Sequence, residues 1–146
     1  MRFWDSSALI PLVCDEAQTR FCMNLLKVDP IIIVWTLASV EVYSALCRQF
    51  REKRLNRKEF QTAKARNATL WQSYTEITHF SLVKKRSYRL LETHTLRAAD
   101  SLHLAAALVA FEEQTSDVEF VTFDSRLAVA AEREGFIVVG PERIKP

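Results

Sequence analysis

Glycine and cysteine are scarce in this 146-residue sequence, and their scarcity excludes several classes of site. Its two glycines, Gly135 and Gly140, are too few for a Walker phosphate-binding loop or a GxGxxG dinucleotide fingerprint. The three cysteines, Cys14, Cys22 and Cys47, form no CxxC pair, so the sequence indicates neither a zinc knuckle nor a disulfide framework. We therefore expect reduced thiols and a cytoplasmic protein.

Long apolar runs and an excess of one charge are also missing. The apolar run IIIVW at residues 31–35 is far too short to cross a bilayer, and we expect no membrane association. The N-terminal stretch has an acid before its apolar run and no small-residue cleavage site, so we expect no signal peptide. The formal net charge is only +2, so a nucleic-acid partner must be argued from local clusters of charge.

Short apolar segments alternate with longer amphipathic ones along the chain. This alternation predicts an α/β fold with a mostly parallel sheet of about four to five strands flanked by helices. The strands are expected at residues 1–4, 31–37, 78–83, 119–123 and 136–140. The helices are expected at residues 7–26, 39–55, 56–75, 84–93, 96–108 and 125–135. The length and the lack of linkers or repeats favour a single domain over residues 1–146.

Three local features refine this expectation. The run at 31–37 is rich in β-branched residues, which favours a central parallel strand. We expect interruptions of the first helix near Pro11 and near Asp15. Two pairs of helices follow one another without a strand between them, and we expect these to form an added arm or hairpin.

Four acidic residues lie where predicted strands end or predicted helices begin. Asp5 ends the first strand, and Asp124 ends the strand at 119–123. Glu41 lies in the first turn of the helix after 31–37, and Asp100 lies near the start of its helix. Because the carboxyl ends of parallel strands face one crevice, these four acids can converge there.

Each of these acids also has a purely structural explanation. Aspartate is a common helix N-cap, and acids in a first helical turn are stabilised by the helix dipole. Four converging carboxylates, in contrast, repel one another unless a cation compensates them. Mg²⁺ or Mn²⁺ prefers oxygen ligands and supports hydrolysis of phosphodiesters or phosphate esters. Spacing alone does not decide between caps and a metal site.

Four segments of the chain resemble the PIN-domain ribonucleases, and especially the VapC toxins of bacterial toxin–antitoxin pairs. They are FWDSSALIPL (3–12), ASVEVYSAL (38–46), LRAADSLHLAAAL (96–108) and FVTFDSRLAVAAEREGFIVV (120–139). They lie in the family's order and span nearly the whole chain, with a weak match from about 51 to 95. The resemblance implies a PIN-like three-layer α/β sandwich. It also implies a Mg²⁺- or Mn²⁺-dependent endoribonuclease that is the toxin of a type II toxin–antitoxin system.

The resemblance assigns a role to each of the four acids, all of which we expect to be catalytic. Asp5, Asp100 and Asp124 match the family's metal-holding acids, and Glu41 matches the acid that often acts through water. None of the family's acids is missing, so the resemblance does not imply an inactive relative.

Two hydroxyl residues are expected to support the acids. Thr122 matches the family's hydroxyl residue that orients the site, and Ser7 matches a serine that commonly follows the first acid by two positions. Ser6 and Ser101 stand where the family often has Thr and Ala, and neither departure threatens the chemistry.

The resemblance also implies partners. One is an antitoxin protein whose C-terminal segment lies across the acidic crevice and often places an arginine among the carboxylates. A second copy of the chain is expected to form a homodimer through helices. The substrate is expected to be RNA, and the family's targets include transfer RNA and ribosomal RNA.

Basic residues gather at 48–58 and at 84–89. A charge-rich helix is usually just solvated, but a nuclease needs cations to hold a polyanion. The candidate RNA contacts are Arg48, Arg51, Lys84, Lys85, Arg86 and His103. For His103, three residues after Asp100 on its helix, we favour the alternative of a hydrogen-bonded, semi-buried histidine.

Two other classes of function compete with a nuclease. One is a non-catalytic RNA-binding module with a PIN fold, against which the intact set of acids argues. The other is another Mg²⁺ phosphoryl-transfer enzyme, such as a phosphatase of the haloacid-dehalogenase type. Those enzymes begin with a DxD motif, whereas this chain has DSS at residues 5–7. A response-regulator receiver would need a lysine after a late strand, and none is present there.

Overall fold

A computed structural model describes residues 1–140 of the chain, in which five strands and seven helices form. The strands are β1 (Arg2–Trp4), β2 (Ile33–Trp35), β3 (Thr75–Ile77), β4 (Glu119–Val121) and β5 (Ile137–Val139). The helices are α1 (Ser6–Val13), α2 (Thr19–Val28), α3 (Ala38–Arg51), α4 (Arg57–Trp71), α5 (Phe80–Thr93), α6 (Ala98–Ala110) and α7 (Ser125–Arg133). The predicted domain extends to residue 146, and residues 141–146 lie outside the described part.

The five strands form one fully parallel sheet in the order β3-β2-β1-β4-β5. The central strand is β1, in which Phe3 aligns with Ile33 of β2 on one side and with Phe120 of β4 on the other. The prediction of a parallel α/β sheet is confirmed. The strand predicted as central, β2, pairs on both sides but lies one position away from the centre.

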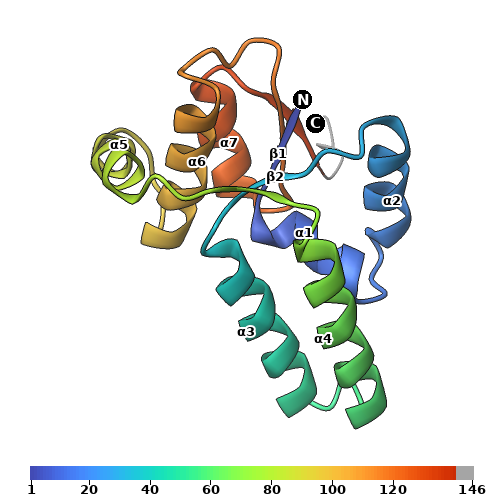
Figure 1. Ribbon diagram of the computed structural model, residues 1–146. Helices are drawn as coiled ribbons and strands as arrows, with labels where there is room; N and C mark the ends of the chain where they lie inside the picture. The colour runs from blue at the N-terminus through green and yellow to red at the C-terminus, as the bar shows by residue number, and fades with distance from the viewer. Residues whose placement is uncertain (141–146) are drawn as a thin grey trace, which may run out of the picture.

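Successive residues of each inner strand pack into different cores, because side chains alternate between the faces of a sheet. Phe3 and Phe120 stack with ring centroids 5.4 Å apart in a core completed by α5, α6 and α7. Their neighbours Trp4 and Val121 pack on the opposite face with residues of α1, α2, α3 and α4. The fold is therefore the expected three-layer sandwich, with one group of helices on each face of the sheet (Figure 1).

The helices α3 and α4 form the predicted arm, lying side by side and extending away from the sheet (Figure 1). A capping box starts α4: the Asn56 side chain accepts from the Glu59 N–H at 2.8 Å, and the Glu59 carboxylate accepts from the Asn56 N–H at 2.7 Å. The rings of Phe50 and Phe60 stack across the two helices with centroids 4.7 Å apart. Local capping and this ring contact hold the hairpin closed.

The predicted strand at 78–83 is wrong. The strand in this region is β3, at Thr75–Ile77, and Phe80 already begins α5. The buried residues Val83, Ser87 and Leu90 are spaced by four and three positions, the period of a helix face. The edge strand β3 is three residues long and largely exposed, so it carries almost no hydrophobic pattern, whereas the apolar cluster beside it looks like a strand.

The predicted interruption at Pro11 is also wrong, whereas the one near Asp15 is confirmed. Pro11 lies inside α1, and the chain leaves helical structure only after Val13. Proline near the end of a short helix removes a single backbone hydrogen bond, which α1 tolerates. Thr19 Oγ donates to the Pro11 carbonyl at 2.7 Å and ties the next helix to this end of α1.

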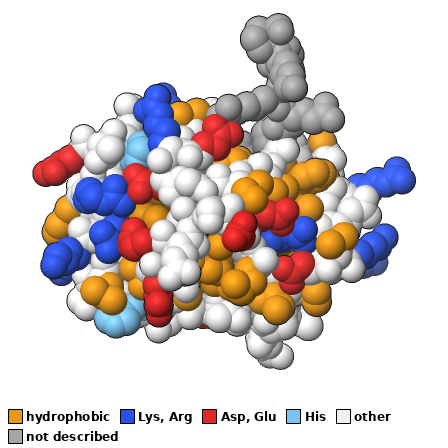
Figure 2. All heavy atoms as spheres, turned by 90° about the horizontal axis from the view of Figure 1, so that it is seen from above, with side chains coloured by type: hydrophobic (Ala, Val, Ile, Leu, Met, Phe, Trp, Pro, Cys, Tyr) orange, Lys and Arg blue, Asp and Glu red, His pale blue; other side chains and the backbone are white. Residues whose placement is uncertain are grey.

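The surface carries charges of both signs. On the face seen from above in Figure 2, Lys and Arg side chains alternate with Asp and Glu side chains and with apolar patches, in keeping with the small net charge. Within residues 1–140, no helix combines the length and apolar character needed to cross a membrane.

The α6 helix is the main apolar support of the sheet, which a matched pair of substitutions tests. Leu104 on α6 is 0% exposed, and Leu82 on α5 is 47% exposed. We expect Leu104→Ala to lower the free energy of unfolding by about 2–5 kcal/mol, because it leaves a cavity in the core. The same change at Leu82 should cost less than about 1 kcal/mol. Urea denaturation followed by circular dichroism measures both, and equal losses would contradict this packing.

Candidate active site

Three of the four predicted acids follow adjacent strands at one edge of the sheet. Asp5 comes directly after β1, Glu41 lies in the first turn of α3 after β2, and Asp124 lies three residues after the end of β4. The strands β2, β1 and β4 are neighbours and all run in the same direction. The topology therefore brings these three carboxylates to the crevice at the carboxyl ends of the strands.

The fourth acid, Asp100, comes from the first turn of α6. Its carboxylate is partly buried, and the pKa of Asp100 is raised, first by this burial and then by the negative charge of Asp124. Glu41 raises that pKa further, while the charges of His103 and Arg97 oppose the rise. The electrostatic coupling shows that Asp100 shares its surroundings with Asp124 and Glu41.

Asp5 is the most enclosed of the four acids, with only 2% of its surface exposed. Its Oδ1 accepts hydrogen bonds from Ser7 Oγ at 2.7 Å and from the Ala8 N–H at 3.2 Å, and the second of these caps α1. Burial nevertheless raises the pKa of Asp5 to about 6, although the charge of His103 and the hydroxyls of Ser7 and Thr122 lower it. The carboxylate thus lies where an additional positive charge would stabilise it.

Two hydroxyl groups connect the ends of β1 and β4. Ser7 Oγ accepts from the Phe123 N–H at 2.8 Å and lies 3.5 Å from Thr122 Oγ. Thr122 Oγ in turn accepts from the Asp124 N–H at 3.0 Å. Asp124 itself caps α7, its Oδ1 accepting from the Leu127 N–H at 2.8 Å. Ser7 and Thr122 therefore fix the backbone that carries the first and last acids, in the positions where we expected supporting residues.

His103 binds Glu41, an interaction that the sequence did not reveal. Its Nε2 is hydrogen-bonded to Glu41 Oε2, and the ring is 1% exposed. Burial opposes charge on the ring, but the hydrogen bond and charge of Glu41, together with Asp5 and Asp100, raise the pKa of His103 overall. This agrees with the alternative that we favoured for His103, a hydrogen-bonded histidine, although the ring is more deeply buried than expected and leaves no surface for a direct contact with RNA. Its position three residues after Asp100 was the one available signal, and it did not point to Glu41.

The other predicted RNA contacts lie on the surface of two helices. Arg48 and Arg51 are exposed on the last turns of α3, and Lys84 and Lys85 are exposed on α5. Arg86 is partly buried and forms an ion pair with Glu113 at 2.7 Å, so its charge is already matched. The α3 arginines are seven and ten residues beyond Glu41, about 10–15 Å along the helix axis. They therefore lie outside the immediate surroundings of the carboxylates.

An apolar hollow of about 210 Å³ adjoins Glu41. It is lined, besides Glu41, by Trp35, Leu37, Val40, Ala99 and Leu102. The surface beside Glu41 is therefore apolar.

The donor set suits a hard divalent cation, since it consists of carboxylate oxygens and the negative charges of Asp124 and Glu41 help to raise the pKa of Asp100. Within residues 1–140, no three or more His, Cys, Asp or Glu side chains are placed so that together they could hold a metal ion. Capping uses one oxygen of Asp5 and one of Asp124, so capping and ion binding need not compete for the same atom.

The chain is similar to known proteins in both sequence and fold. The PIN domain family matches residues 2–133. Ribonuclease VapC45 of Mycobacterium tuberculosis (strain CDC 1551 / Oshkosh) is 26% identical over 144 residues, which cover 99% of this chain and 97% of the relative. Among solved structures, FitAcB from Neisseria gonorrhoeae superposes with a TM-score of 0.66 at 14% identity, covering 99% of this chain and 100% of that chain. VapBC2 from Rickettsia felis, solved with a DNA fragment from its promoter, gives 0.62 at 9% identity, covering 97% and 98%.

The raised pKa of Asp5 predicts a pH-dependent cost to stability. Because its pKa is about 6 in the folded chain and lower when unfolded, ionisation of Asp5 weakens the fold as the pH rises from about 4 to about 6. Asp5→Asn removes this cost. We expect its gain in the free energy of unfolding to be on the order of 2 kcal/mol larger at pH 7.5 than at pH 4.

Urea denaturation in EDTA, at several pH values, measures this difference between the variant and the unchanged chain. The matched control is Asp117→Asn, which alters an exposed aspartate and should show no such trend. A gain for Asp5→Asn that is equal at pH 4 and pH 7.5 would contradict the burial of an ionised carboxylate at this position.

Proposed function

Because the chain belongs to the PIN domain family, we propose that it is a Mg²⁺- or Mn²⁺-dependent endoribonuclease, the toxin of a type II toxin–antitoxin pair. The observation that carries the proposal is the gathering of Asp5, Glu41, Asp100 and Asp124 at the carboxyl edge of the sheet. The naming of a relative that covers the whole fold as a ribonuclease supports the same activity.

Each of the four acids has a role in the proposed reaction. Asp5, Asp100 and Asp124 would bind the ion, and Glu41 would bind it directly or through a water molecule. When bound, the ion supplies charge that polarises a phosphate oxygen and acidifies water for attack on phosphorus. Asp5 and Asp124 are pre-positioned because each is anchored as a helix cap. This anchoring limits how far either carboxylate moves when substrate arrives.

The surrounding side chains orient the acids. Ser7 donates to the Asp5 carboxylate and fixes its direction, whereas Thr122 accepts from the Asp124 N–H and fixes the backbone that carries this acid. His103 holds Glu41 through a buried hydrogen bond and counteracts the repulsion among the acids in the ion's absence. RNA is held by basic side chains outside this crevice, for which the exposed residues Arg48, Arg51, Lys84 and Lys85 are candidates.

The proposed toxin also needs partner molecules. We propose that residues 1–146 form one PIN domain that acts in the cytoplasm as a homodimer, on transfer RNA or ribosomal RNA. The cognate antitoxin would place a segment across the crevice, where a cationic side chain neutralises the carboxylates. Solved structures with this fold include FitAB bound to DNA and VapBC2 bound to promoter DNA, and this supports the assignment to such a system.

RNA cleavage tests the central claim. Antitoxin-free protein is incubated with total bacterial RNA and Mg²⁺ or Mn²⁺, and the fragment ends are mapped. We expect discrete fragments that disappear with EDTA. Asp5→Asn, Asp100→Asn and Asp124→Asn should each reduce the rate by at least about a hundredfold, since each removes a ligand of the ion. Glu41→Gln should be less severe if it acts through water.

Ion binding is checked independently of activity. Mg²⁺ or Mn²⁺ should raise the thermal midpoint of the unchanged chain and of the control Asp117→Asn, but raise it less for Asp100→Asn. Folded, ion-loaded protein that binds RNA without cutting any class of it would contradict the nuclease and favour a binding module. Cleavage that persists in EDTA or in folded Asp5→Asn would contradict the assigned site.

A further inference from the structure

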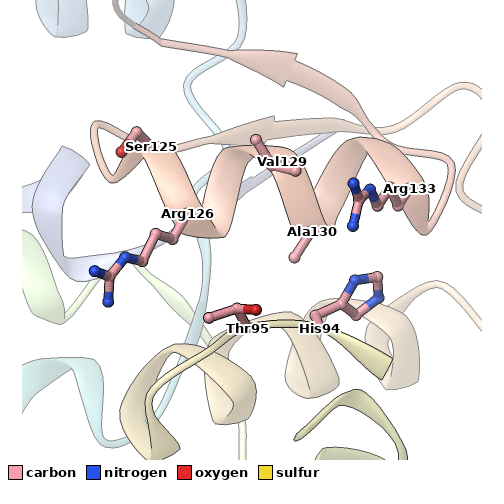
Figure 3. A pocket seen from close by; sticks show the side chains of 7 residues that line it. All are labelled: His94, Thr95, Ser125, Arg126, Val129, Ala130 and Arg133. Carbon is pink, nitrogen blue, oxygen red and sulfur yellow. The ribbon is translucent and has the colours of Figure 1, made fainter. Parts of the chain in front are cut away.

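A groove of about 390 Å³ runs along α7. One wall is α7 itself, and the other is the segment between α5 and α6 (Figure 3). It is lined by His94, Thr95, Ser125, Arg126, Val129, Ala130 and Arg133.

Two arginines give this groove its charge. Arg126 and Arg133 are both exposed, and in residues 1–140 neither guanidinium has a hydrogen-bond or ion-pair partner. Glu134, one of the two acids adjacent to Arg133 in the sequence, is already paired with other side chains. Glu134 accepts from Arg89 at 3.0 and 2.9 Å and lies 2.6 Å from His94 Nε2. The bond from Arg89 and then that from His94 lower the pKa of Glu134, so its negative charge is paired with these two side chains.

The two arginines are spaced along one side of the helix. Seven residues make two turns, so Arg126 and Arg133 project from nearly the same side about 10 Å apart along the axis (Figure 3). The charges of a strand are carried by its successive phosphates, and this span is long enough for the two arginines to contact different phosphates of one strand. The spacing suits the repeated negative charges of one strand.

Both walls of the groove are close in sequence to predicted acids. Ser125 directly follows Asp124 on the α7 wall. On the opposite wall, Thr95 lies shortly before α6, whose first turn carries Asp100. A strand whose phosphate lies over the carboxylates can therefore continue into the groove without turning away from the protein.

We propose that this groove binds the phosphate backbone of the RNA strand on one side of the cleaved bond. Arg126 holds the phosphate nearer the carboxylates, and Arg133 holds one further along the same strand. The hydroxyls of Thr95 and Ser125 are exposed and can donate to phosphate or ribose oxygens. Val129 and Ala130 form an apolar floor between the two charges. The assignment rests on the proposed nuclease activity and adds a subsite to it.

This subsite increases the affinity for RNA and fixes its position on the protein. It does not select the RNA sequence, because contacts to phosphate do not distinguish the bases. Neither arginine was among the RNA contacts expected from the sequence. Those expectations came from basic clusters, whereas Arg126 and Arg133 are separated by six residues that include an acid, Glu132.

Charge removal in the groove tests the proposal. The variants are Arg126→Gln, Arg133→Gln and the double variant, with Arg20→Gln on α2 as a matched change of an exposed arginine elsewhere. The probe is a fluorescein-labelled single-stranded RNA of twelve nucleotides containing a mapped cleavage site. Binding is measured by anisotropy in an Asp100→Asn background, so that the RNA stays intact.

We expect each groove variant to weaken binding by roughly three- to tenfold, as for loss of one exposed charged contact. The slope of log affinity against log salt should fall by about 0.7 per arginine. In the active chain, KM should rise while kcat at saturating RNA is unchanged. Arg126→Lys and Arg133→Lys retain the charge and should bind nearly as the unchanged chain does, as should Arg20→Gln.

The outcomes separate the groove from the nuclease. If the unchanged chain cleaves RNA and the folded Gln variants keep its affinity, salt slope and KM, the groove assignment is overturned and the nuclease stands. If the Gln variants lose affinity for one RNA sequence but not for a scrambled one, the assignment of a backbone-binding subsite is also overturned. If the unchanged chain neither binds nor cleaves RNA, the proposed function itself fails, and the groove assignment fails with it.

Discussion

Repulsion among carboxylates is the physical constraint around which this end of the molecule is organised. Asp5 is almost fully buried, and Asp100 is close enough to Asp124 and Glu41 for its pKa to be raised by them. Hydroxyls, a backbone N–H and the imidazole of His103 offset the burial of the Asp5 carboxylate only in part. Carboxylates whose negative charge is not fully compensated attract cations. The raised pKa of Asp5, caused by burial, and that of Asp100, caused by burial and neighbouring acids, both mark carboxylates that a cation would stabilise.

Helix capping and ion binding use the same side chains here, so the two explanations for an acid at a strand end do not exclude each other. Asp5 caps α1 and Asp124 caps α7, each through a single oxygen. The cap fixes the carboxylate in direction, and Ser7 and Thr122 join the two capped turns across adjacent strands. Stability and chemistry therefore depend on the same short hydrogen-bonded segment, which explains how three-residue strands can carry a precise site.

The site also lies where the two helical layers meet at the sheet edge. Glu41 belongs to the layer of α1 to α4, whereas Asp100 and Asp124 belong to the layer of α5 to α7. The buried pair of Glu41 with His103 of α6 joins the two layers directly. The two neighbouring surfaces differ: the hollow beside Glu41 is apolar, whereas the groove along α7 carries positive charge. A substrate strand placed over the acids therefore meets two unlike surfaces.

The sequence by itself determined the parallel α/β pattern, the order of the elements and the four acids at their junctions. These are local properties: strand runs, helix periodicity and caps depend on residues a few positions apart. It failed at β3, where three exposed residues carry no pattern, and at Pro11, where one lost bond did not end a helix. Only the tertiary structure decided that His103 is buried against Glu41, 62 residues away, and that Arg126 and Arg133 face a common groove. Such pairings depend on which strands are neighbours and on how the helices pack, and no local spacing in the chain encodes that.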